Sequence, residues 1–113
     1  MEPAVREKIQ KLQSIEENLH NYLGQKQQAQ AQILELESAT EALETAKKSY
    51  RIIGNIMVEQ EQAAVQEHLA DKLAHSKKRI SVLEKQEHRL KEEAESLQKE
   101  IMQKMGEQDG NVQ

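Results

Sequence analysis

One short stretch in the middle of the chain decides the fold, because it interrupts two long charged segments with apolar and β-branched residues. It reads Tyr50-Arg51-Ile52-Ile53-Gly54-Asn55-Ile56-Met57-Val58-Glu59. Apolar runs on both sides of a Gly-Asn pair are typical of a β-hairpin with a tight turn. We therefore expect a hairpin over residues 49–60.

This hairpin is expected to be incomplete in a single chain. With a two-residue turn, alternate side chains lie on opposite faces, and both faces are then mainly apolar. Two strands alone are marginally stable in water, and both outer edges would present unpaired backbone groups. We therefore expect several chains to pool their hairpins into a shared sheet or barrel. The residues expected to carry this oligomerisation are Tyr50, Ile52, Ile53, Gly54, Ile56, Met57 and Val58.

The segments on both sides of the hairpin carry heptad repeats. In residues 4–48, nine of the twelve a and d positions are apolar: Val5, Leu12, Leu19, Lys26, Ile33 and Thr40 at a, and Lys8, Ile15, Tyr22, Ala29, Leu36 and Leu43 at d. In residues 61–105, eight of ten are apolar: Leu73, Ile80, Glu87, Ala94 and Ile101 at a, and Leu69, Ser76, Leu83, Leu90 and Leu97 at d. Registers of this length favour a coiled coil.

These repeats predict one domain of a mainly α class. Two helices of similar length, joined by a short insert, are expected to pack as an antiparallel coiled coil with both termini at one end and the hairpin at the other. Residues 106–113 are expected to form a disordered tail, because Gly106 and Gly110 weaken the helix. The polar seam residues Lys26 and Glu87 either fix the register or, as we expect, reach solvent.

Composition excludes several classes of protein. The 113 residues carry a net charge of −4 and include two Tyr but no Phe, Trp or Cys, so an aromatic globular core, disulfides and thiolate metal sites are excluded. Interspersed charges argue against nucleic acid, and no apolar run is long enough to span a membrane. The default expectation is a soluble, cytoplasmic chain.

No pattern in the sequence predicts an enzyme. There is no glycine-rich phosphate loop, no metalloprotease motif and no nucleophile with a placed base, so we expect no catalytic, cofactor-binding or metal residues. The four His residues are scattered. The basic run of residues 75–79 has acidic neighbours on both sides, and its simplest interpretation is a solvated helix face.

The central stretch between two heptad helices resembles the corresponding segment of β-class prefoldin subunits. The residues that carry the resemblance are the run from Tyr50 to Glu59: an aromatic, a basic residue, two aliphatics, Gly, and then an aliphatic triplet after Asn55. Both archaeal prefoldin beta and the second subunit of the eukaryotic complex are similar. Asn55 in place of a second Gly, and the short segment of residues 46–49, leave the turn type and the choice between these two groups open.

The resemblance implies a function and a set of partners. Prefoldins are hexamers of two α-class and four β-class subunits, in which the hairpins form a double β-barrel and the coiled coils extend from it. They hold unfolded proteins at the coiled-coil tips without ATP and deliver them to a group II cytosolic chaperonin; the main eukaryotic clients are actin and tubulin. These are expectations from the resemblance, not from composition.

The helix ends carry the candidate client-binding residues. They are Val5, Ile9 and Leu12 from the first helix and Leu97, Ile101, Met102 and Met105 from the second. Helix ends fray, and Met adapts its shape to irregular partners. These residues are either the last positions of the coiled-coil seam or a surface for client chains, and the off-seam residues Ile9, Met102 and Met105 distinguish the two.

A structural tether is the alternative function. In that case the apolar insert docks one fixed partner and the chain has no chaperone activity. A chain that forms no complex with an α-class subunit, and fails to keep a denatured test protein soluble, would favour the tether.

Overall fold

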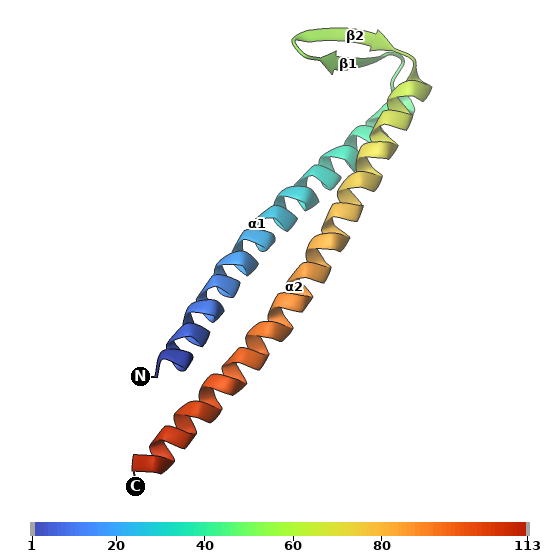
Figure 1. Cartoon of the computed structure of the whole chain (residues 1–113). Helices are drawn as coiled ribbons and strands as arrows, with labels where there is room; N and C mark the ends of the chain where they lie inside the picture. The colour runs from blue at the N-terminus through green and yellow to red at the C-terminus, as the bar shows by residue number, and fades with distance from the viewer. Residues whose placement is uncertain (1, 113) are drawn as a thin grey trace. The chain divides into compact units, whose positions relative to one another are not determined.

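The computed structural model describes the backbone of residues 2–112 and the side chains of residues 2–106. The element order is α1 (Pro3–Thr45), β1 (Ser49–Ile53), β2 (Ile56–Gln60) and α2 (Gln62–Val112), and Figure 1 shows the hairpin of β1 and β2 at the end where α1 stops and α2 starts. The mainly helical class and the central hairpin expected from the sequence are both confirmed.

The chain divides into two compact units. The hairpin unit, Lys26–Val82, contains the hairpin and the helix segments next to it. The terminal unit combines Met1–Gln25 with Leu83–Gln113, within the described residues.

Helix α1 begins at Pro3, one residue before the expected start, and ends earlier than expected. Pro3 suits the first helical position, because the N–H that proline lacks would have no intrahelical partner there, and the Arg6 N–H donates to the Glu2 carbonyl over 3.0 Å. The helix stops at Thr45, not at residue 48. The Leu43 carbonyl accepts instead from the Ala46 N–H, over 3.3 Å, and from the Gln62 side chain.

Helix α2 begins close to the expected residue and continues further. The Glu61 carbonyl accepts the first helical hydrogen bond, from the Val65 N–H over 3.2 Å. The backbone remains helical to Val112, whereas the sequence placed the end at Met105 and a disordered tail after it. A glycine within a helix costs only about 1 kcal/mol relative to alanine, so Gly106 does not end the helix.

The heptad register is confirmed in both units. Every predicted a and d position is buried or half-buried, and the most enclosed include Val5, Ile15, Ala29 and Leu83. In the hairpin unit Ser76 Oγ lies 3.5 Å from Gln32 Oε1, and Thr40 Oγ1 donates to the Leu36 carbonyl over 2.8 Å. The polar seam residues therefore have hydrogen-bonding partners.

One expectation about the seam is wrong. Glu87 is only 7% exposed and does not reach solvent. It occupies an a position, and on an antiparallel pair of helices a short acidic side chain at that position points into the seam. Lys8 and Lys26, the other charged seam residues, are half-buried.

Ion pairs join the two helices of the terminal unit. Lys8 Nζ lies 3.1 Å from a Glu100 oxygen, and Lys11 Nζ lies 3.2 Å from Glu93. Residue numbers thus rise along one helix as they fall along the other, which fixes the antiparallel direction. Within α2, Glu95 and Lys99 form an ion pair four residues apart, at 3.7 Å. Exposed pairs of this kind contribute about 0–1 kcal/mol each.

Candidate functional site

The hairpin has the tight turn that the sequence predicts. Its antiparallel register pairs Ser49 with Gln60 at the base and Ile53 with Ile56 at the turn, which leaves Gly54 and Asn55 as the two turn residues. Gly54 has φ +62°, and no non-glycine residue among the described ones has a positive φ. A positive φ at the first turn position alone is the type II′ pattern, which suits the twist of paired strands.

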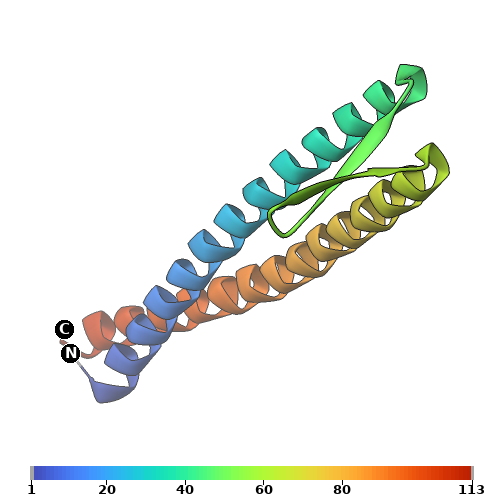
Figure 2. The same ribbon diagram turned by 90° about the horizontal axis from the view of Figure 1, so that it is seen from above.

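Both faces of the hairpin expose apolar side chains. Tyr50, Ile52 and Met57 lie on one face, and Ile53, Ile56 and Val58 lie on the other. Ile52 is 69% exposed and Met57 65%, while Val58, at 38%, is the least exposed of the six. The hairpin extends sideways from the helix ends of its own unit in Figure 1, and in the view from above it runs back along the adjacent helix segments (Figure 2). All seven residues expected to carry oligomerisation are therefore accessible in the single chain.

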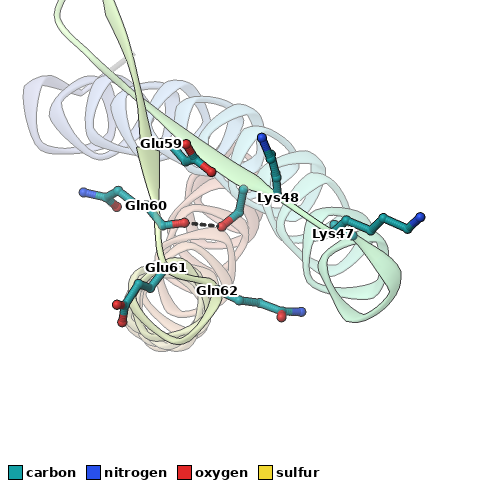
Figure 3. A pocket seen from close by; sticks show the side chains of 8 residues that line it. Lys47, Lys48, Glu59, Gln60, Glu61 and Gln62 are labelled. Carbon is teal, nitrogen blue, oxygen red and sulfur yellow. Dashed lines mark hydrogen bonds between the residues drawn. The ribbon is translucent and has the colours of Figure 1, made fainter.

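Two side chains anchor the base of the hairpin. The Ser49 hydroxyl donates to the Gln60 carbonyl over 2.6 Å, which is the dashed line in Figure 3. The Gln62 amide donates to the Leu43 carbonyl at the end of α1. Around these contacts lies a solvent-open depression of about 360 Å³, lined mainly by charged and amide side chains including Lys48 and Glu59. The sequence analysis missed both anchoring hydrogen bonds. Gln62 and Leu43 are 19 residues apart and Ser49 and Gln60 are 11 apart, so no local pattern marks these contacts.

The first prediction concerns this anchor. Ser49→Ala removes one hydrogen bond of a buried hydroxyl and leaves the Gln60 carbonyl with one partner fewer, at a cost of about 1 kcal/mol. Local opening of the hairpin should then become about fivefold more frequent. Hydrogen exchange of the strand amides measures it. Ser38→Ala, at an exposed position on α1, is the matched control; equal exchange in both variants would show that the anchor has no role.

Arg51 brings a positive charge from β1 toward α2. Partial desolvation, followed by the positive charges of Arg51 and Lys72, lowers the pKa of the half-buried His68 imidazole, and Asp71 opposes this effect. The positive charge of Arg51 on the hairpin thus contributes to lowering the pKa of a histidine on α2.

The second prediction follows from the direction of that pKa shift. Because the folded chain disfavours protonated His68, the unfolded chain binds more protons below the ordinary histidine pKa of about 6.5. As far as His68 determines it, the free energy of unfolding should therefore be greatest above this pH. It should fall as the pH drops toward the lowered pKa that His68 has in the folded chain. His68→Gln should flatten the pH dependence of the unfolding midpoint below pH about 6.5. An unchanged slope would exclude His68, and His20→Gln, at an exposed position on α1, is the control.

The terminal unit separates the candidate client-binding residues into two groups. Val5, Leu97 and Ile101 are buried in the seam, and Leu12 and Ile9 are half-buried. Met102 is 73% exposed and Met105 is 48% exposed. The off-seam methionines are thus the accessible part of this surface, and the buried residues support the helix pair.

Some exposed apolar residues lie outside both predicted surfaces. They are Leu23 and Leu34 on α1 and Val82 on α2. Their heptad positions off the a/d seam are the sequence signal for their exposure.

Among the described residues, no group of three or more metal-ligating side chains lies close enough to hold an ion, and no helix is long and apolar enough to cross a membrane.

Two long antiparallel helices joined by a hairpin that is apolar on both faces define the class of two-helix coiled-coil proteins with a central β-hairpin. Residues 6–108 match the sequence model of a family described as prefoldin subunit. The prefoldin beta subunit of Pyrobaculum islandicum is 27% identical over 98% of this chain and 91% of its own length. That of Archaeoglobus fulgidus is 31% identical over 86% of this chain and 87% of its own.

A solved structure agrees with these sequence matches. The crystal structure of the prefoldin beta subunit from Thermococcus strain KS-1 matches with a TM-score of 0.83 and 25% identity, over 90% of this chain and 92% of that one. The chain belongs to the prefoldin family, as a β-class subunit. It is therefore a prefoldin-type chaperone subunit that assembles with other prefoldin subunits, in a family of non-enzymatic chaperones.

Proposed function

We propose that this chain is one of four β-class subunits in a hexamer with two α-class subunits. The apolar hairpin joins neighbouring strands into the body of the complex. The observation that supports this is the exposure of apolar side chains on both hairpin faces, which a solitary chain leaves in water. The hexamer composition comes from the family resemblance.

The client-binding part of the proposal rests on the terminal unit. Met102 and Met105 present flexible, polarizable side chains next to a closed seam, and such side chains adapt to many apolar partners. Contacts of this kind are weak one at a time, and several subunits acting together multiply them. Weak contacts also explain how a client is released without ATP, so the chain needs no catalytic or cofactor site.

The proposed clients and location follow the family. Unfolded proteins are held at the helix ends and passed to a group II chaperonin in the cytoplasm, with actin and tubulin as clients if the chain is eukaryotic. No nucleic acid or membrane takes part.

The test is assembly followed by an aggregation assay. The chain is mixed with an α-class subunit, and the product is weighed by sedimentation. We expect a hexamer that keeps a denatured test protein soluble in the absence of ATP. A chain that stays apart from the α-class subunit and leaves the test protein to aggregate would instead support a coiled-coil tether.

A further inference from the structure

Positive charge is concentrated in one part of the hairpin unit. Residues 72–82 of α2 contain three Lys and one Arg and no carboxylate, and removing these four charges from the net charge of −4 leaves −8 on the rest of the chain. The adjacent part of α1, residues 26–34, also has no acidic residue and is rich in Gln. The contact between Ser76 and Gln32 places these two segments side by side.

Most of this charge lies on one face of α2. Lys72, His75, Lys78 and Arg79 are spaced by three, four and seven residues, so their side chains share one side of the helix, which we call the basic face. All four are exposed. His75, Lys78 and Arg79 line a shallow depression together with Val82, which is 46% exposed. Lys77 points to the opposite side.

We propose that the basic face docks a short acidic peptide segment of another protein, one that carries apolar residues among its carboxylates. Arg79 is suited to hold a carboxylate with two parallel hydrogen bonds, and Lys78 supplies a second positive charge one residue away. The exposed Val82 offers an apolar contact beside them. This docking is independent of client binding at the helix ends.

The dimensions and surroundings favour a peptide over a nucleic acid. Lys72 to Arg79 spans about 10 Å of helix, which matches about three residues of extended peptide. Neither of the two Tyr residues lies in segments 26–34 or 72–82, so no aromatic ring is available there to stack on bases.

The experiment measures peptide binding to the assembled complex. The probe is a fluorescein-labelled peptide of alternating Glu and Leu, and fluorescence anisotropy gives its affinity. The double variant Lys78→Gln, Arg79→Gln should bind about tenfold more weakly. The control Lys77→Gln, Lys91→Gln loses the same charge from the opposite side of the helix and should bind as the parent does. Lys78→Arg alone should keep the affinity, and added salt should weaken it.

Three results would overturn the proposal. The first is equal affinity in the basic-face variant and its control, which would reduce the effect to net charge. The second is equal affinity for the same peptide with Gln in place of Glu. The third is tighter binding of a single-stranded RNA that the basic-face variant abolishes, which would assign the face to nucleic acid. Circular dichroism of both variants excludes loss of helix as the cause.

Discussion

Ile52→Glu is expected to prevent this chain from assembling with other prefoldin subunits while leaving its two helices folded. Ile52 is 69% exposed in the single chain, so the substitution removes little packing within it. In a shared sheet the same position becomes buried, and the variant loses about 1.5–3 kcal/mol of apolar burial. A carboxylate placed there without a partner costs several kcal/mol more. The association constant should fall by at least about a hundredfold for each contact between subunits that buries residue 52.

Sedimentation velocity of the variant with an α-class subunit measures this loss, and circular dichroism reports the helices. Leu34→Glu is the matched control, because Leu34 is 66% exposed, belongs to the same unit, and lies on the outer side of α1. It introduces the same charge at nearly the same exposure. The proposed role of the hairpin would be refuted if the two variants assembled equally well, or if Ile52→Glu melted the helices.

The parts of the fold that the sequence predicts are those with a repeated pattern. The heptad positions repeat over the whole length of each helix, so one misplaced residue such as Lys26 does not shift the register. The hairpin is recognisable because a single Gly-Asn pair lies between two apolar runs, and the register follows once the turn has two residues. Both features are local, and local features are what a single sequence specifies most directly.

What the sequence does not predict depends on contacts between distant residues. The early end of α1 needs the Gln62 side chain at the Leu43 carbonyl, and the hairpin base needs Ser49 at Gln60. The two-residue turn predicts that Ser49 lies opposite Gln60, but no pattern in the sequence marks the hydroxyl contact or the contact between Gln62 and Leu43. Burial of Glu87 is missed for a related reason, because a polar residue at an a position is compatible with either solvent exposure or enclosure. At the helix ends the heptad register already separates Val5, in the seam, from Met102, outside it, but only the structure shows that the off-seam Ile9 is half-buried.

Replacing both methionines of the terminal unit, Met102→Gln and Met105→Gln, is expected to weaken the holding of unfolded proteins without affecting assembly. Both side chains are exposed, and Gln keeps their length and their helix propensity while removing most of their apolar character. Each lost contact is worth about 1 kcal/mol. In the proposed hexamer several β-class subunits would hold one client together, and these losses would then multiply across the complex.

The amount of complex needed to keep half of a denatured test protein soluble should rise about tenfold. The position of the two residues supports a specific effect: the Lys8–Glu100 pair at 3.1 Å joins the helices next to Ile9 and Met102, so these apolar side chains belong to one end of the terminal unit. Leu34→Gln together with Leu23→Gln is the control, since it removes two exposed leucines elsewhere on the surface. If this control lost as much activity as the methionine variant, client binding would depend on exposed apolar area in general and not on the helix ends.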